Sequence, residues 1–381
     1  MKIFAMSKFR IALMCFIILS SYSFSYSQSD KLFSKKAPNI IQGNKEKITP
    51  DVIGAHYDLR RSLPKGYVDD GSVDYTKYIQ KGIDENSNVL MPNFPILIND
   101  GGLSIRSNSN IAFQDKSSII LKSSSKGSYA LLNVSNVENV IIKNPVIVGD
   151  RDSHIGKTGE WGMGIQISES QNIRIISAII SNCWGDGIYI GSSTSQKNDH
   201  IEINSVKIDN CRRNGISITH GSNIEILNAV ISNTNGVAPM AGIDIEPNNG
   251  MAAIDNIKII NPTTINNGNF GIVVSLGALP SEVSKNVKIR IDNHIDNGSK
   301  IAFCLAGFRG NYQDKKILTG LIEVNNPKWN NNKTTLLANK YYLGPMTKFK
   351  NVQIYKKQRQ SNEELQKIKQ DFKLYGNINI E

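Results

Sequence analysis

Short runs in which apolar and polar residues alternate cover most of the chain. One kind of run follows a glycine, as in Ile188-Tyr189-Ile190 and Ile216-Ser217-Ile218. The other opens with a polar residue, as in the run that starts at Asn172. Branched residues at a period of two indicate β-strands, because successive side chains of a strand point to opposite faces. We therefore expect short strands separated by turns rich in Asn, Gly, Ser and Asp.

The glycine-centred runs form an internal repeat. The aligned glycines are separated by 23, 28, 27 and 29 residues, and they are Gly164, Gly187, Gly215, Gly242 and Gly271. Repeats of this length predict a solenoid. The unequal lengths, and the lack of a helix in each unit, favour a parallel β-helix over a leucine-rich horseshoe. The prediction is an all-β, single-stranded solenoid whose turns vary in length.

The glycine followed by Ile-x-Ile, together with the opening run VDYTKYIQKGIDENSNVLMP, resembles the coils and the N-terminal capping helix of a known group. This group is the right-handed parallel β-helix proteins of the pectin-lyase-like superfamily. The resemblance covers roughly residues 73–330. It implies enzymes that cleave or epimerise polysaccharides, with phage tailspikes and adhesins sharing the fold. Because one fold hosts many functions, the side chains of the site must decide between these roles.

The chain divides into four parts. Residues 1–27 combine early cations, an apolar run and small residues before the expected cleavage point, which predicts a signal peptide and a secreted or periplasmic protein. Residues 28–60 show no periodicity and are expected to be a leader or a partly disordered arm. The β-helix is expected over 61–345, and a C-terminal cap over 346–381. Beyond the signal, no segment is long and apolar enough to span a bilayer.

Two amphipathic helices are predicted to cover the open ends of the solenoid, since uncovered sheet edges invite pairing with other chains. The first runs from Asp74 to Ile83. The second runs from Asn362 to Tyr375, with Ser361 as its N-cap.

Three cysteines remain outside the signal: Cys183, Cys211 and Cys304. Cys183 and Cys211 occupy the same position in successive coils, so a disulfide between them is sterically conceivable. A ladder of buried thiols is the favoured interpretation. The spacing of cysteines and histidines does not indicate a zinc site.

The formal net charge of +11 falls to +8 when the three cations of the signal, Lys2, Lys8 and Arg10, are removed. A moderately basic secreted protein suits an anionic partner, and an acidic glycan fits this compartment better than nucleic acid does. The motifs of phosphate, dinucleotide and serine-hydrolase sites are absent, so no organic cofactor is implied. The sequence leaves the oligomeric state open.

Asp244 and Glu246 are expected to project from the same outer face of one strand. Asp186 comes one residue before an aligned glycine, near the start of the same sheet and two coils away. Hydrolysis of a glycosidic bond needs one carboxylic acid and one carboxylate, and two neighbouring carboxyls raise one another's pKa. We therefore predict Asp244 and Glu246 as the catalytic pair, with Asp186 assisting. Calcium binding by these acids is a further possibility.

Arg212 and Arg213 enter on the coil between Asp186 and Asp244, and His220 leaves that coil at its far end. The arginines could bind an anionic group of the substrate, or form salt bridges with the acids. A lyase or epimerase acting on a uronate would need Arg213 or His220 as its base. The chain shows neither the lyase motifs nor the paired-aspartate motif of polygalacturonases.

The segment from Gly149 to Gly162 departs from the repeat and is rich in chemically useful residues. His154 and Glu160 are secondary candidates there. Trp161 and Trp184 occupy equivalent positions in neighbouring coils, where they could form a stacking platform for sugar rings or cover the core. In the outward column of the repeat, Tyr189 is a further candidate for substrate binding.

These features together favour a secreted polysaccharide-active enzyme, with glycoside hydrolysis as the leading reaction. The first alternative is a lyase or epimerase that acts on a uronate glycan. The second alternative is a glycan-binding or adhesin β-helix without catalysis. The sugar, the linkage, endo or exo action and the stereochemical course are not given by the sequence.

Overall fold

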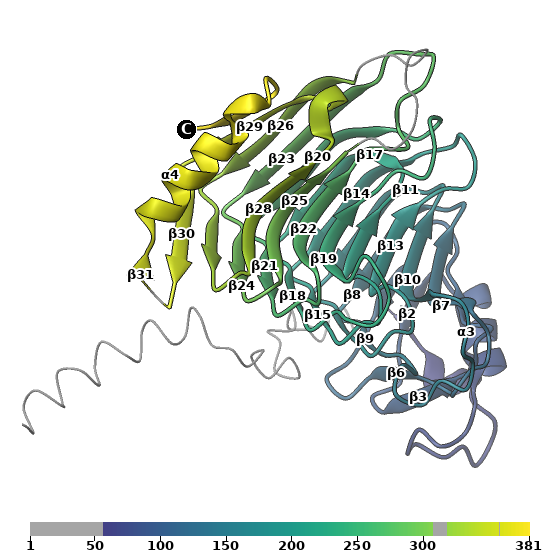
Figure 1. The fold of residues 1–381 in the computed structure, drawn as a ribbon. Helices are drawn as coiled ribbons and strands as arrows, with labels where there is room; N and C mark the ends of the chain where they lie inside the picture. The colour runs from purple at the N-terminus through teal and green to yellow at the C-terminus, as the bar shows by residue number, and fades with distance from the viewer. Residues whose placement is uncertain (1–55, 308–317, 358) are drawn as a thin grey trace, which may run out of the picture.

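The structure is a computed structural model that describes residues 56–307, 318–357 and 359–381 (Figure 1). The predicted signal peptide, 1–27, and most of the expected arm, 28–60, lie outside the described residues. The described chain winds into a long stack of parallel strands, which runs from the purple N-terminal end to the yellow C-terminal end in Figure 1. The predicted parallel β-helix is confirmed.

Within the described residues, the strands of successive coils assemble into three sheets. The 12-stranded sheet contains β1 (Tyr57–Asp58), β2 (Asn88–Leu90), β5 (Asn110–Ala112), β8 (Glu138–Lys143), β11 (Gln171–Ile176), β14 (Asn198–Asn204), β17 (Gly221–Leu227), β20 (Ile254–Ile260), β23 (Asn286–Asp292), β26 (Thr319–Asn325), β29 (Met346–Lys350) and β32 (Ile378–Ile380). The 11-stranded sheet contains β3 (Pro95–Ile98), β6 (Ser118–Leu121), β9 (Val146–Val148), β12 (Ile179–Ser181), β15 (Lys207–Asp209), β18 (Val230–Ser232), β21 (Thr263–Ile265), β24 (Ile295–Asn297), β27 (Lys328–Asn330), β30 (Gln353–Lys356) and the antiparallel β31 (Arg359–Gln360). The 9-stranded sheet contains β4 (Leu103–Ser104), β7 (Ser128–Ser135), β10 (Trp161–Ser168), β13 (Ile188–Gly191), β16 (Ile216–Ile218), β19 (Ala241–Ile245), β22 (Phe270–Ser275), β25 (Ile301–Ala306) and β28 (Thr334–Asn339).

The 9-stranded sheet carries the glycine-centred repeat. The isoleucines that follow the aligned glycines are in register across five coils and fully buried; they are Ile165, Ile188, Ile216, Ile243 and Ile272. Their side chains join the continuous apolar core that all three sheets enclose. The alignment made from the sequence therefore gives the correct register.

The repeated glycines are required by the close approach of neighbouring coils. A Cβ on Gly187 would lie 2.8 Å from the carbonyl oxygen of Gly215, and a Cβ on Gly215 would lie 2.6 Å from that of Gly242. The Cβ of Gly242 would meet the carbonyl oxygen of Gly271 at 2.6 Å. Because these obstacles are backbone atoms of the next coil, they cannot turn aside as a side chain does.

Asparagines form ladders at the corners between sheets. Asn228, Asn261, Asn293 and Asn326 all adopt the left-handed conformation, which Asn tolerates better than most residues. The side-chain amides of the last three each donate to the amide oxygen one coil earlier: Asn261 to Asn228 at 3.0 Å, Asn293 to Asn261 at 2.9 Å and Asn326 to Asn293 at 3.1 Å. The abundance of Asn in the turns thus serves both the tight bend and the stacking of coils.

Helices lie at both ends of the stack (Figure 1). The first predicted helix is present as α3 (Thr76–Glu85), which buries Ile79 and Ile83 against the core. It contacts η1 (Leu59–Ser62), which begins two residues before the expected start of the β-helix.

At the other end, α4 (Asn362–Asp371) begins at the predicted N-cap, where the hydroxyl of Ser361 accepts the amide of Glu364 at 3.4 Å. The short helices η2 (Tyr341–Leu343) and η3 (Phe372–Leu374) complete this end. Strands β29, β30 and β32 extend two of the sheets beyond residue 345.

The three cysteines of the described chain, Cys183, Cys211 and Cys304, are free and buried. Cys183 and Cys211 both belong to the apolar core. The favoured prediction of a buried thiol ladder is confirmed, and the disulfide alternative is not formed.

A polar relay interrupts the core near the C-terminal end. Asp296 takes the interior position of β24 that Ile208 and Ile231 take in earlier coils. The indole of Trp329 donates to Nδ1 of His294 at 3.1 Å. Nε2 of His294 therefore donates to the hydroxyl of Thr264 at 2.7 Å, and that hydroxyl donates to Asp296 at 2.6 Å. Each buried polar group of the relay thus has a partner.

We expect Gly215→Ala to destabilise the fold, because its methyl group collides with the backbone of the next coil. Overpacking of this kind typically costs about 1–3 kcal/mol. Gly376→Ala is the matched control, since a Cβ there has nothing within 4 Å. Unfolding of both variants followed by circular dichroism would test this, and equal stability of the two would contradict the close-approach explanation.

Asp296 should make stability depend on pH. Burial raises the pKa of Asp296 to about 6 from 3.8, so the folded state binds the proton more tightly than the unfolded state. The stabilisation is complete below pH 3.8 and is lost as the pH rises through about 6. The loss amounts to about 3 kcal/mol. Thermal unfolding of wild type and Asp296→Asn between pH 4 and 8 should show a flatter profile for the variant; parallel profiles would contradict the assignment.

Candidate functional site

The outer face of the 9-stranded sheet carries the predicted column of site residues. Gln166, Tyr189, Ser217, Asp244 and Val273 are in register on β10, β13, β16, β19 and β22. Ser217 is fully buried, and Asp244 is only 1% exposed. Asp244 thus lies in the predicted column of the sheet, but it is not exposed to solvent. Side chains from the loop before β16 cover it.

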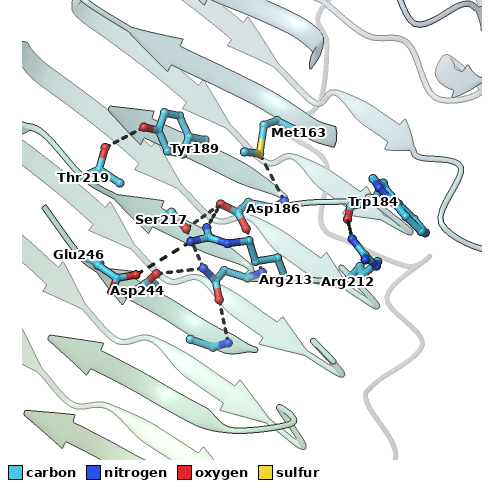
Figure 2. A network of polar contacts seen from close by, with 12 residues as sticks. Met163, Trp184, Asp186, Tyr189, Arg212, Arg213, Ser217, Thr219, Asp244 and Glu246 are labelled. Carbon is cyan, nitrogen blue, oxygen red and sulfur yellow. Dashed lines mark hydrogen bonds and ion pairs between the residues drawn. The ribbon is translucent and has the colours of Figure 1, made fainter. Parts of the chain in front are cut away.

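Asp186 is the anchor of this cover, as Figure 2 shows. Its carboxylate accepts Nη1 of Arg213 at 2.9 Å and the hydroxyl of Ser217 at 2.8 Å. It also accepts the backbone amide of Asn214 at 3.0 Å. Asp186 is fully buried, so these three donors replace its solvation.

Asn214 links Asp186 to Asp244. Its side-chain amide donates to Ser217 and to Asp244, both at 3.0 Å, while its amide oxygen accepts the backbone amide of Ala241 at 2.9 Å. Asp244 is left with one carboxyl oxygen that is buried and has no hydrogen-bond partner. A neutral, protonated Asp244 is compatible with this environment, whereas a carboxylate would need more donors.

Glu246 follows β19 and is the accessible member of the acidic group. Its side chain is 40% exposed and lies 4.0 Å from Nη2 of Arg213. The hydroxyl of Ser275 donates to it at 3.3 Å. Arg213 thus stretches across the sheet from Asp186 to Glu246 (Figure 2).

The charges of the group are uneven. Burial raises the pKa of Asp244 well above its usual range, and the nearby carboxyl of Glu246 raises it further. Burial also raises the pKa of Asp186, although Arg213 and Ser217 act against that change. For Arg213, burial by itself lowers the pKa, but Asp186 and Asp244 outweigh burial and raise it overall. The arrangement therefore sets a proton-holding acid beside a partly solvated one.

Glu246 also lines an open groove with a volume of about 620 Å³. The groove crosses the ends of four successive coils, and its other lining residues are Ser275, Gly277, Ala278, Pro280, Ala306, Gly307, Asn339 and Lys340. Ser275, Ala306 and Asn339 are in register on β22, β25 and β28. The groove therefore runs along the axis of the stack, away from Glu246 towards the C-terminal end.

Arg212 takes a different place from its neighbour Arg213. Its guanidinium lies 3.8 Å from the ring centre of Trp184, and His154 stacks on the same ring with centroids 3.8 Å apart. Two groups this close cannot share one ring face, so they cover opposite faces of the indole. The proposed sugar platform is therefore wrong for Trp184, whose faces are filled from within the protein.

The segment before β10 is fixed by the same cluster. Nδ1 of His154 is 2.8 Å from the carboxyl of Asp150, and the hydroxyl of Tyr129 donates to that carboxyl as well. Arg212 donates to the carbonyl oxygen of Gly159 at 2.9 Å. These contacts hold the irregular loop against the stack. His154 therefore helps to fix this loop and lies outside the acidic group.

The remaining candidates lie around the acidic group. Glu160 is close enough to raise the pKa of Arg213, behind the contributions of Asp186 and Asp244. Trp161 begins β10 and is 51% exposed. The hydroxyl of Tyr189 pairs with that of Thr219 at 2.9 Å.

His220 comes after β16, at the opposite end of that strand from Arg213, and is 3% exposed. The structure therefore brings together Asp186, Arg213, Asp244 and Glu246, and leaves His220, Trp184 and His154 outside their network.

Asn214 and Ser217 are members of the group that were not among the predicted site residues. Both occupy repeat positions that hold other candidates: Asn214 is equivalent to Asp186, and Ser217 is equivalent to Asp244. Their position in the repeat was the available signal. Neutral side chains between two acidic coils are natural bridges, because amides and hydroxyls both donate and accept hydrogen bonds.

The described part of the chain has no group of three or more His, Cys, Asp or Glu side chains placed to hold a metal ion. Within the acidic group the positive charge comes from Arg213. Across residues 56–307, 318–357 and 359–381, no helix is both long and apolar enough to cross a membrane.

No protein-family model matches the chain. Over 171 residues it is 35% identical to the uncharacterized protein YclG of Bacillus subtilis (strain 168). This match covers 41% of this chain and 29% of YclG. Over 163 residues it is 26% identical to the uncharacterized SPbeta prophage-derived protein YorA of the same organism, covering 38% of this chain and 28% of YorA. The chain thus spans less than a third of the length of these curated relatives.

Three solved structures resemble the chain at low identity. A polygalacturonase from Erwinia carotovora is 13% identical, with a TM-score of 0.57 over 84% of this chain and 98% of that one. The A-module of a mannuronan C-5 epimerase from Azotobacter vinelandii is 13% identical, with a TM-score of 0.51 over 78% and 95%. The surface adhesin PfbA of Streptococcus pneumoniae is 14% identical, with a TM-score of 0.50 over 80% and 92%. The chain therefore shares the right-handed parallel β-helix fold of these proteins, which the resemblance of its glycine-centred coils implied.

Proposed function

We propose that this chain is a secreted polysaccharide-active enzyme, and that it is a glycoside hydrolase using Asp244 and Glu246. The observation that carries the proposal is the contrast between these two carboxyls. Asp244 is buried and has a strongly raised pKa, while Glu246 is partly solvated and lines the open groove. Pairs of carboxyl groups whose environments differ in this way are suited to acid and base roles.

In this proposal, Asp244 is the acid, and it gives its proton to the leaving glycosidic oxygen after a substrate group has displaced Arg213 from above it. Glu246 is the carboxylate that accepts a proton from the attacking water or attacks the sugar carbon itself. Asp186 and Arg213 are positioning residues that hold the cover over Asp244. The 4.0 Å contact between Arg213 and Glu246 is the loosest of this network, so it is the contact that a substrate group would replace.

The comparisons support a polysaccharide as the substrate class. By their names, two proteins with the same fold act on polysaccharides, one as a polygalacturonase and one as a mannuronan C-5 epimerase. The net positive charge of the chain favours an acidic glycan among these.

A lyase or epimerase reaction through the predicted bases is less well supported. The carboxylates around Arg213 raise its pKa overall, so the guanidinium keeps its proton and cannot act as a base. Burial lowers the pKa of His220, which leaves it neutral, but its side chain is almost fully enclosed.

A non-catalytic glycan-binding role is the second candidate. It is favoured by the burial of Asp244, which in this conformation cannot touch a ligand. The similarity to a surface adhesin is compatible with it. In that case the acidic network would only stabilise the face that the glycan contacts.

The enzyme proposal predicts that Asp244→Asn and Glu246→Gln each lower hydrolysis by at least about a hundredfold, the usual contribution of a general acid or base. Protein lacking residues 1–27 would be incubated with neutral and acidic polysaccharides. Reducing ends and the ultraviolet absorbance of unsaturated uronates would be followed together. The matched control is Glu225→Gln, which removes an acid paired with Lys258 on the 12-stranded sheet.

Reducing ends without absorbance, lost in both site variants and kept in the control, are the expected result. If the ultraviolet absorbance rises together with the reducing ends, the reaction is a lyase reaction and not hydrolysis. Binding to a glycan without any cleavage would favour the second candidate.

Substitutions of Asp186 and Arg213 should have coupled effects on the free energy of unfolding. Arg213→Met leaves a buried carboxyl without its cation, a change that typically costs about 3–5 kcal/mol. Asp186→Asn in the same chain removes the stranded charge, so the double variant should be more stable than the sum of the single changes implies. Chemical unfolding of the four proteins measures this coupling. Additive effects would mean that the pair contributes only through its separate partners.

A further inference from the structure

An aromatic stack stands at the C-terminal end of the described chain. The rings of Tyr342 and Tyr375 are nearly parallel, with an interplanar angle of 7° and centroids 4.9 Å apart. Phe372 stacks behind Tyr375 at 5.7 Å, and the hydroxyl of Tyr375 donates to the carbonyl oxygen of Ala338 at 3.2 Å. The inner rings are therefore anchored to the cap and to β28, and they hold Tyr342 flat against the protein.

Tyr342 itself is open to solvent. It is 66% exposed although one of its faces is covered by Tyr375, so its other face points outwards. A flat exposed ring on a rigid support is suited to stacking. Leu374, at 89% exposed, lies on the neighbouring η3 and adds to the apolar surface.

The stack lies near the far end of the groove that begins at Glu246. Lys340 lines the far end of that groove, and Tyr342 follows it by two residues within the turn of η2. Consecutive Cα atoms are about 3.8 Å apart, so Tyr342 begins within about 8 Å of Lys340. The coils of Ser275, Ala306 and Asn339 lie between Glu246 and this end, at a spacing of about 4.8 Å each.

We infer that Tyr342 and Lys340 form a binding subsite for one ring of an anionic polysaccharide that lies in the groove. The sugar ring stacks on the open face of Tyr342, and its carboxylate or sulfate pairs with the ammonium of Lys340. The inference rests on the proposed function, which places a glycan in the groove. It adds the direction of that glycan, which runs along the stack from Glu246 towards the C-terminal cap. Binding at this subsite does not require Asp244.

Affinity electrophoresis in gels containing polygalacturonate, alginate or neutral dextran tests the subsite. The wild-type protein should be retarded in at least one acidic gel, and Tyr342→Ala should weaken that binding roughly threefold to tenfold, the range expected for one aromatic contact. Tyr342→Phe keeps the ring and should bind as the wild type does. Lys340→Gln should weaken binding in the acidic gels, and its migration in dextran relative to a gel without polysaccharide should match that of the wild type.

The inference is overturned if the wild type is not retarded in either acidic gel, or if Tyr342→Ala binds as tightly as Tyr342→Phe. It is also overturned if Tyr342→Ala changes the sedimentation coefficient of the free protein, because the ring would then contact a second copy of the chain. The outcome is separable from the proposed reaction. If Asp244→Asn loses cleavage but keeps Tyr342-dependent binding, both the subsite and the hydrolase proposal are supported. If the wild type binds through Tyr342 but cleaves nothing, the subsite is supported and the hydrolase proposal is contradicted.

Discussion

The close approach of successive coils at the aligned glycines is the constraint on which the rest of the structure depends. At each aligned glycine the backbone of the next coil lies so near that no Cβ fits between them. This contact fixes both the spacing and the register of the 9-stranded sheet, and register decides which side chains share a column. Asp186, Ser217 and Asp244 are far apart in the sequence, yet they form one hydrogen-bonded group because their coils stack without slippage. A slip of one residue would send the apolar face outwards and scatter the group.

The acidic group is held together by a buried ion pair, which is costly in desolvation free energy. Desolvating Asp186 and Arg213 offsets much of their attraction, so an apolar pair of similar volume would stabilise a plain solenoid at least as well. Asp186 nevertheless accepts three hydrogen bonds, whereas Asp244 next to it keeps one oxygen without a partner. An arrangement that satisfies one acid fully and its neighbour incompletely fits a site that stores a proton better than it fits a surface selected for stability alone.

The sequence predicted the parts of this protein that follow from periodicity. The coil register, the buried isoleucines and the capping residue Ser361 all depend on local pattern and on the geometry of a parallel stack. The membership of Asp186, Asp244 and Glu246 in one group follows from the same register. The burial of Asp244 did not follow, because it depends on where the long side chain of Arg213 lies. The sandwich of Trp184 between Arg212 and His154 and the relay around Asp296 are also beyond a repeat-based argument, since they arise from irregular loops and from polar residues at positions that earlier coils fill with isoleucine.

The burial of Asp244 and the accessibility of Glu246 have the same cause, which is the path of the Arg213 side chain. Arg213 begins before β16 and ends above the sheet, so it covers the middle of the column and leaves the residue beyond the strand uncovered. An open groove starts at that uncovered residue and continues along the stack, lined mainly by small side chains. The small residues Ser275, Gly277, Ala278, Ala306 and Gly307 leave room for an extended ligand parallel to the axis. A rigid solenoid keeps that room open without a conformational change. A polymer is therefore a better match to this surface than a compact molecule, because only a polymer contacts Glu246 and the C-terminal end at once.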